Sequence, residues 1–146
     1  MTPALQDYLV SHSFVEATAS DNVQPSVSTR EYVNGQFRIR IVNERSSEMY
    51  VQVGPAAGAG RYLFLNGVVA FLTSDDAATR VSGQVAERLV HHHEDITRLF
   101  AASPDGEARR ERFALWQSEF AAREQVRLAA DASGATAARK RWWKLW

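Results

Sequence analysis

The chain of 146 residues contains no cysteine. Disulfide bridges, thiolate nucleophiles and zinc–thiolate sites are therefore excluded. The chain also has no run near the roughly 20 apolar residues that a membrane-spanning helix needs. Its first residues lack the basic and apolar segments of a signal peptide. We therefore expect a cytoplasmic protein.

The chain has no net charge, because 17 basic residues balance 17 acidic ones. This balance disfavours both intrinsic disorder and specific binding of nucleic acid. The charges are unevenly placed, since Arg139, Lys140, Arg141 and Lys144 all lie within the last eight positions. Removing these four from the 17 basic residues leaves 13 against 17 acidic residues, a net charge of −4. The body is mildly acidic and the end is basic.

Motifs of catalysis are also missing. The chain has no Gly-x-Ser-x-Gly, which exposes a serine nucleophile, and no His-Glu-x-x-His zinc motif. The glycine-rich stretch 54–60 lacks the Gly-Lys-Ser/Thr ending of a P-loop, which favours a flexible connection over a phosphate site. Neighbouring carboxylates at 75–76 and 94–95 diverge on a helix and are explained by capping and solvation. We expect no catalytic residue, no cofactor and no enzyme activity.

Three consecutive histidines, His91, His92 and His93, precede Glu94 and Asp95 and form the first candidate for a metal site. On a helix, however, side chains converge only at spacings of three or four, as in His91 with Asp95. Such a pair supplies two ligands at most. The spacing therefore favours one histidine at the edge of the core and one on the surface, and we predict no metal site.

Alternating apolar residues predict an antiparallel β-meander. Strands over 31–33 and 37–41 flank Asn34 and Gly35, a pair that suits the positive φ angles of a type I′ turn. A third strand is predicted over 49–53 and a fourth over 61–65. The preceding stretch, 14–27, fits either a loop or an irregular edge strand.

Helical spacing is found on both sides of these strands. Pro3 with apolar residues at 5, 8 and 9 predicts a short N-terminal helix. Asn66 suits the N-cap of a short buried helix. A longer helix is predicted from Asp75 to about 100, where residues 81, 85, 89, 96, 99 and 100 form one apolar stripe. A final helix is predicted over about 107–130, with Phe113 in its apolar stripe.

These elements predict an α+β fold. It contains an antiparallel β-meander of about four strands, a short N-terminal helix and two longer C-terminal helices packed on one face. We assign residues 1–130 to a single domain. Residues 131–136 are small and polar enough to be a linker, so 131–146 are assigned to a linker and a basic, Trp-rich tail.

One face of the meander is a candidate binding surface. Residues 37, 39 and 41 are expected to face the core, which projects Arg38 and Arg40 to the opposite face. Two arginines there suit a phosphate or a carboxylate. The interpretation that we favour is an exposed face that is paired with Glu48 or partly covered by a helix. Tyr50 alternates out of the core beside them, so these four residues are candidate partner-binding residues.

The tail is the second candidate, because Arg141 lies beside Trp142 and Trp143, and Trp146 ends the chain. Interleaved cations and indole rings suit a protein interface, a membrane–water boundary or single-stranded nucleic acid. The tail also suits folding back onto the domain to cover an apolar groove. Membrane and nucleic acid rank last, because four charges provide only weak anchoring.

The order of elements resembles small bacterial immunity-type proteins that are encoded beside polymorphic toxins. The likeness covers about residues 3–128. It rests on the short first helix ending near Ser-Phe-Val at 13–15, the strand pair over 32–53, the Tyr-Leu-Phe-Leu-Asn-Gly-Val-Val join at 62–69 and the two terminal helices. The basic tail does not belong to this pattern.

The resemblance implies a non-catalytic protein that neutralises a cognate toxin by binding it directly. A body of net −4 would suit a basic toxin such as a nuclease. The alternative function is an adaptor or chaperone-like protein that docks on a partner or a membrane surface through its Trp- and Arg-rich tail.

Overall fold

The computed structural model describes residues 1–17, 27–44, 49–57, 61–81 and 83–143. The side chains of these residues are described as far as residue 134. The chain divides into two compact units, Met1–Phe113 and Ala114–Trp146. The first unit contains the sheet and its helices. The second consists of the greater part of one long helix.

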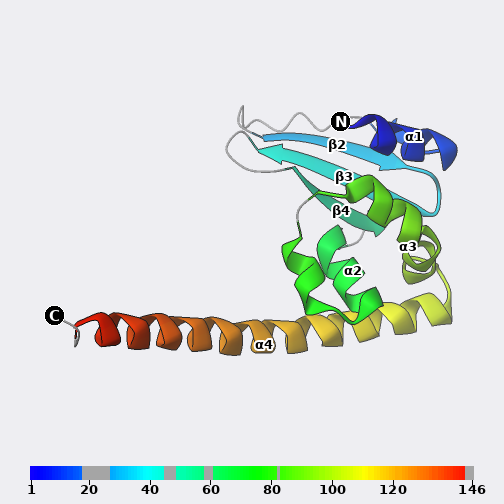
Figure 1. The fold of residues 1–146 in the computed structure, drawn as a ribbon. Helices are drawn as coiled ribbons and strands as arrows, with labels where there is room; N and C mark the ends of the chain where they lie inside the picture. The colour runs from blue at the N-terminus through cyan, green and yellow to red at the C-terminus, as the bar shows by residue number, and fades with distance from the viewer. Residues whose placement is uncertain (18–26, 45–48, 58–60, 82, 144–146) are drawn as a thin grey trace. The chain divides into compact units, whose positions relative to one another are not determined.

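In the described part of the chain, five strands form one antiparallel sheet in the order β1-β2-β3-β4-β5 (Figure 1). The predicted α+β meander is confirmed, with one strand more than expected. The additional strand, β1, forms within the stretch 14–27. The fourth predicted strand is shorter than expected and becomes β5. The strands are Val15–Ala17 (β1), Val27–Val33 (β2), Phe37–Glu44 (β3), Tyr50–Pro55 (β4) and Leu63–Phe64 (β5).

The turn between β2 and β3 lies where Asn34 and Gly35 predict it, but its type differs. Gly35 has a φ of +83°, whereas Asn34 keeps a negative φ. A type I′ turn requires positive φ at both positions. Asn34 Oδ1 instead accepts hydrogen bonds from the backbone N–H groups of Gln36 and Phe37, at 3.0 and 3.3 Å. The side chain of Asn34 therefore shapes the turn that Gly35 makes sterically accessible.

Helices α1 (Pro3–Ser11) and α3 (Val85–Leu99) pack against each other. Proline occupies the first turn of α1, as predicted, and Thr2 caps it by accepting a hydrogen bond from the N–H of Leu5. Leu5, Tyr8 and Leu9 are buried, which confirms the apolar stripe expected for this helix.

The core lies between these helices and one face of the sheet. Phe37, Ile39 and Val53 are 0% exposed. The ring of Phe37 lies 5.5 Å from that of His93 on α3 and 5.2 Å from that of Phe14. Each fully buried side chain of this size stabilises the fold by about 1.5–3 kcal/mol. The face predicted to be apolar is therefore the face that the helices cover.

Helix α2 (Leu65–Thr73) starts one residue before the expected cap. Its N-cap is Phe64, which makes no capping hydrogen bond through its side chain, so the assignment of Asn66 as the cap is wrong. The reason is that β5 leads directly into the helix. Asn66 lies in the first helical turn, where its amide donates to the carbonyl of Val81 and its oxygen accepts from Arg88.

The single long helix predicted from Asp75 to about 100 is also wrong. Asp75 does cap a helix, but this is the short 3₁₀ helix η1 (Asp76–Arg80). Gly83 and Gln84 then adopt φ angles of +78° and +55°, which lie outside the helical region, and α3 begins after them. Val81 consequently leaves the apolar stripe and is 40% exposed.

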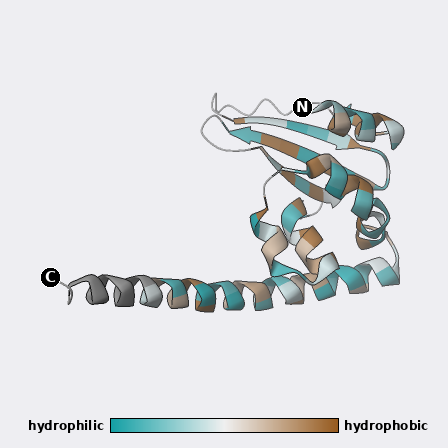
Figure 2. Ribbon diagram, viewed as in Figure 1, coloured by the Kyte–Doolittle hydropathy of each residue, from teal (hydrophilic) through white to brown (hydrophobic). Residues whose placement is uncertain are grey.

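Helix α4 (Pro104–Trp143) begins at the predicted break, where the N–H of Gly106 donates to Ser103 Oγ at 3.2 Å. It continues through 131–136, so the predicted linker is helical. Hydrophilic and hydrophobic residues alternate in short bands along it (Figure 2). None of the described helices combines the length and the apolar character that crossing a membrane requires.

Candidate functional site

The second face of the sheet carries the sequence-predicted arginines. Strand pairing places Arg40 between Glu31 on β2 and Gln52 on β4. Because side chains alternate along a strand, these residues point away from the helix-covered face that holds Phe37. We call this surface the outer face and define it by Glu31, Arg38, Arg40, Tyr50, Gln52, Tyr62 and Phe64.

Both arginines of the outer face are held by Glu31. Arg40 Nε and Nη2 each lie 2.7 Å from Glu31 Oε1, and Arg38 Nη1 lies 3.6 Å from Oε2. The side chains of Arg38 and Arg40 are 24% and 31% exposed, so solvent screens these pairs and each contributes at most about 1 kcal/mol. Glu48, which the sequence suggested as their partner, lies outside the described residues. The contact with Glu31 fixes the positions of both guanidinium groups.

Two further contacts orient these arginines. The guanidinium carbon of Arg40 lies 3.6 Å from the centre of the Tyr62 ring, a cation–π geometry. Arg38 Nε donates a hydrogen bond to the carbonyl of Ala56 at 2.9 Å. The Tyr62 ring also packs on Gly54, where an added Cβ would lie 2.9 Å from the ring. The first glycine of the stretch 54–60 therefore has a packing role.

Tyr50 and Phe64 form an aromatic pair at the β4–β5 end of the outer face. Their ring centroids are 5.6 Å apart. The Tyr50 hydroxyl donates to Glu44 Oε1 at 3.4 Å, and partial burial together with the Glu44 carboxylate raises the pKa of Tyr50. Phe64 is 56% exposed, which is unusual for a phenylalanine. This end of the face presents aromatic surface.

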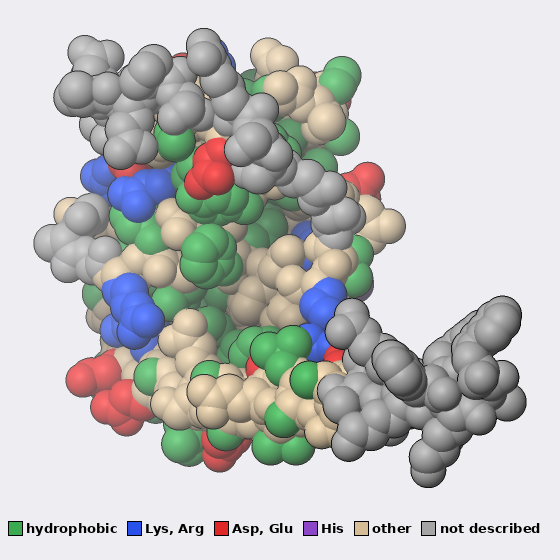
Figure 3. All heavy atoms as spheres, turned by 90° about the vertical axis from the view of Figure 1, so that its left-hand side faces the viewer, with side chains coloured by type: hydrophobic (Ala, Val, Ile, Leu, Met, Phe, Trp, Pro, Cys, Tyr) green, Lys and Arg blue, Asp and Glu red, His purple; other side chains and the backbone are tan. Residues whose placement is uncertain are grey.

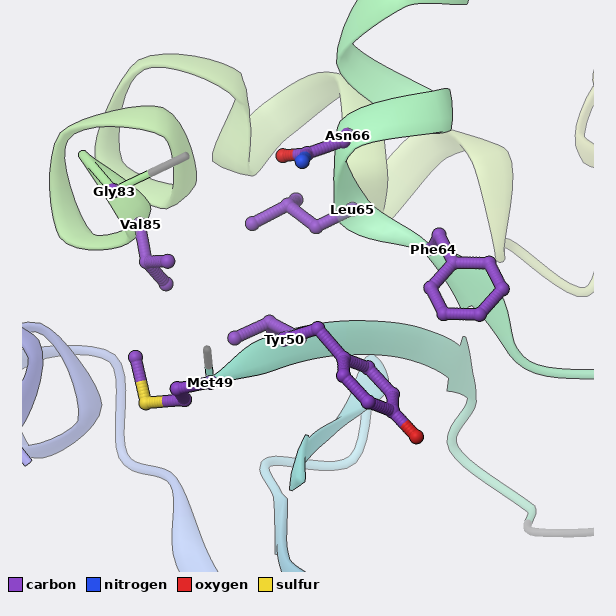
Figure 4. A pocket seen from close by; sticks show the side chains of 8 residues that line it. Met49, Tyr50, Phe64, Leu65, Asn66, Gly83 and Val85 are labelled. Carbon is purple, nitrogen blue, oxygen red and sulfur yellow. The ribbon is translucent and has the colours of Figure 1, made fainter. Parts of the chain in front are cut away.

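A pocket of about 140 Å³ opens beside this aromatic pair. β5 pairs only with Gln52 and Val53, so strand pairing on this side of β4 ends before Val51. Leu65 and Val85 point from α2 and α3 toward β4, while the rings of Tyr50 and Phe64 lie next to each other (Figure 4). The pocket is lined by Met49, Tyr50, Val51, Phe64, Leu65, Asn66, Gly83 and Val85.

Exposed hydrophobic side chains and Lys or Arg side chains are both seen in the view of Figure 3. Large apolar residues are exposed elsewhere too, as with Val10 on α1 and Val90 on α3, which are 72% and 59% exposed. Exposed apolar residues are common on protein surfaces and by themselves need no ligand to explain them.

The side chains of the sequence-predicted tail residues are not described by the structure. Arg141, Trp142 and Trp143 lie on the last turn of α4, in the segment for which side chains are not described. Trp146 lies outside the described residues. Of the eight sequence-predicted binding residues, the structure therefore brings together Arg38, Arg40 and Tyr50. It adds Glu31, Tyr62 and Phe64, which sequence reasoning missed.

The three consecutive histidines do not converge. His91 is exposed, His92 is buried, and His93 is half-buried. Burial lowers the pKa of His92, and the neighbouring His91 lowers it further. Among the described residues, no group of three or more histidine, aspartate or glutamate side chains is placed to hold a metal ion.

His93 instead faces helix α1. Its Nδ1 lies 2.7 Å from the Tyr8 hydroxyl, and its ring centroid lies 4.1 Å from that of His12. Burial lowers the pKa of His93, and the nearby charge of His12 lowers it further. Residue 93 is too far in the sequence from residues 8 and 12 for helical or strand spacing to relate them. The sequence pattern therefore could not predict this contact.

Comparison with protein-family models finds no match to this chain, and comparisons with curated proteins and with solved structures find none.

Proposed function

We propose that this chain is a non-catalytic binding protein, an immunity-type inhibitor that neutralises a cognate bacterial toxin by direct contact. The observation that supports this proposal best is the outer face. Its two arginines are already fixed by Glu31, Tyr62 and Ala56 before any partner arrives. A side chain that is ordered in advance loses less conformational entropy on binding.

The composition of the outer face also suits recognition of a protein. Arginine, tyrosine and other aromatic residues are enriched at protein interfaces and supply most of the residues that dominate binding energy. Here Arg40 stacks on Tyr62, and Tyr50 lies against Phe64. The two pairs lie on β3, β4 and β5 and on the residue directly before β5, so one partner can contact both.

The pocket beside Tyr50 and Phe64 gives this surface a place for an apolar anchor. Its volume of about 140 Å³ suits a single leucine, methionine or phenylalanine side chain of the partner. The net charge of −4 outside the basic end favours approach of a basic toxin at long range. Contact would then be made by the outer face and the pocket.

The proposal is tested by co-expressing this chain with the toxin encoded by the neighbouring gene and measuring growth and co-purification. We expect Phe64→Ser to weaken toxin binding by about tenfold or more, because Phe64 supplies exposed aromatic area at the pocket. Val90→Ser is the matched control, since Val90 is 59% exposed against 56% for Phe64 but lies on α3. It should change affinity less than twofold.

Arg40→Ala should also weaken binding, because it removes the ordered contact area of the guanidinium group and leaves Tyr62 without its stacking partner. Failure of the unsubstituted chain to rescue growth or to co-purify with the toxin would contradict the proposed function. Equal losses for Phe64→Ser and Val90→Ser would place the interface elsewhere.

A second candidate function is an adaptor or chaperone-like protein that docks on a partner or a membrane surface through the Trp- and Arg-rich tail at the end of α4. The observation that favours it is the exposure of Leu115, Val126 and Leu128, at 61%, 71% and 56%, on a helix that reaches Trp143. Deleting residues 138–146 in the same binding assay separates the two candidates. The adaptor requires that deletion to abolish binding, whereas the inhibitor requires binding to follow the outer face.

A further inference from the structure

Two histidines from distant parts of the chain meet where α1 lies on the body. His12 ends α1 and His93 lies in the middle of α3. Their ring centroids are 4.1 Å apart, with an angle of 40° between the rings. At this distance the two rings are in direct contact, so the charge carried by one acts strongly on the other.

Hydrogen bonds hold both rings in place. The backbone carbonyl of Tyr8 lies 3.0 Å from His12 Nδ1, and because a carbonyl only accepts, the imidazole donates. The Tyr8 hydroxyl lies 2.7 Å from His93 Nδ1. Asn34 in the β2–β3 turn donates to the carbonyl of His12 at 3.2 Å. The contact therefore joins α1, α3 and the sheet.

Among the residues that the structure describes, few groups can neutralise two positive charges at this contact. From α1, the groups that face His93 are Tyr8 and His12, and β3 contributes the ring of Phe37 at 5.5 Å. On α3 itself, Glu94 is the carboxylate whose charge reaches His93. Its side chain is 86% exposed and lies 3.9 Å from Arg98, so solvent and that arginine weaken its effect.

We propose that the His12–His93 contact is proton-sensitive: it holds α1 on the body while at most one ring is charged, and releases α1 when both rings carry a proton. The physical reason is repulsion between two imidazolium rings in contact, away from full solvent screening. Burial already opposes a charge on His93, because it lowers the pKa of that ring. Release would expose the apolar side chains of Leu5 and Leu9, which are 0% and 4% exposed while α1 is docked.

The absence of cysteine makes a direct test available, because one introduced thiol is the only thiol in the chain. Leu9→Cys places it on the buried side of α1 and Val10→Cys on the exposed side, at 72% exposure for the native residue. The ratio of their maleimide-labelling rates cancels the pH dependence of the thiol itself. We expect the Leu9→Cys rate, divided by the Val10→Cys rate, to rise about tenfold between pH 7.5 and 5.5. A tenfold change in the release of α1 corresponds to a difference of one pKa unit between its docked and released states.

Two histidine substitutions decide whether the pair is responsible. His12→Gln leaves one ring, so no charge pair forms and the labelling ratio should rise much less, because only burial then opposes a proton on His93. His91→Gln removes an exposed histidine of the same helix and should leave the rise intact. A rise of unchanged size after His12→Gln would overturn the proposal.

Global unfolding is distinguished by Leu89→Cys, at a side chain of α3 that is 0% exposed. Labelling there should increase much less than at Leu9→Cys over the same pH range, and an increase of equal size at both positions would overturn the proposal. Hydrogen exchange of the unsubstituted chain provides a second measurement that needs no core substitution. It should show amides of residues 6–11 losing more protection at pH 5.5 than those of α3.

Discussion

At the scale of single residues, the backbone passes very close to itself at the start of α4. Gly106 is buried, and a Cβ added there would lie 2.1 Å from the carbonyl oxygen of Ala101. Arg110 fastens the same turn, because its Nη1 donates to the carbonyls of Leu99 and Ala101 at 2.8 and 3.0 Å. The segment 99–101 and the first turns of α4 therefore cannot separate without losing these hydrogen bonds.

We expect Gly106→Ala to lower the free energy of unfolding by about 3 kcal/mol, because the methyl group forces the segments apart. Gly134→Ala is the matched control, since nothing lies within 4 Å of a Cβ added there. It should favour the helix by about 1 kcal/mol, because alanine is the better helix former. Urea denaturation followed by circular dichroism measures both. An unchanged unfolding midpoint for Gly106→Ala would contradict the close approach.

The outer face shows what single-residue patterns reveal and what they omit. Alternation along β3 was enough to place Arg38 and Arg40 opposite the core, and the structure confirms that placement. Their carboxylate partner was not predictable, because Glu31 reaches them only through the register of β2 against β3. Alternation along a strand indicates the face of the sheet on which a side chain lies. It does not indicate which residue of the neighbouring strand lies beside that side chain.

At the scale of elements, three non-glycine residues in the part of the chain that the structure describes have positive φ angles outside the helices and strands: Ser13, Ser74 and Gln84. Ser74 ends α2 in the left-handed conformation, with a φ of +53°. Glycine is the usual residue at this position, because a Cβ there is sterically unfavourable. The end of α2 therefore contains local strain that a single substitution can remove.

We expect Ser74→Gly to raise the free energy of unfolding by about 1 kcal/mol, by relieving the left-handed conformation. The same substitution at Ser28, an exposed residue of β2, should have the opposite sign, with a loss of about 0.5–1 kcal/mol. Thermal melting of the two variants beside the unsubstituted chain compares them directly. Two losses of equal size would show that Ser74 is not strained.

Breaks between elements were harder to predict than the elements themselves. The stripe from Val85 to Leu99 is helical as expected, but Gly83 and Gln84 separate it from η1. Val81 fits the same helical spacing and is nevertheless outside the helix. A spacing of four residues holds by chance across a turn, so periodicity alone cannot locate the break.

At the scale of the whole molecule, buried histidines make stability depend on pH. Burial lowers the pKa of both His92 and His93 below the ordinary value of 6.5. Between the lowered pKa and the unfolded value, the unfolded chain binds more protons than the folded one. The stability contributed by keeping these rings neutral is complete above pH 6.5 and is lost as the pH falls below it.

We therefore expect the free energy of unfolding to fall between pH 7.5 and 5.5, as measured by urea denaturation at each pH. His92→Gln should make this fall smaller, because the buried ring that resists protonation is gone. His91→Gln, at an exposed position of the same helix, should reduce the fall by less than His92→Gln, because it removes only the neighbouring charge and leaves the buried ring in place. Stability that rises on acidification over this range would contradict the burial of these rings.

The sequence by itself determined the local features: the alternation that forms β3 and β4, the buried stripe of α1 and α3, and the position of the turn at Gly35. These depend on contacts between near neighbours in the chain, whose spacing is visible in the sequence. Tertiary structure alone decided which distant residues meet. It brings His12 to His93 and Glu31 to Arg40. It also brings Asn66 on α2 to Arg88 on α3. Each of these contacts joins residues whose proximity depends on how strands register and helices pack, and no local pattern encodes that geometry.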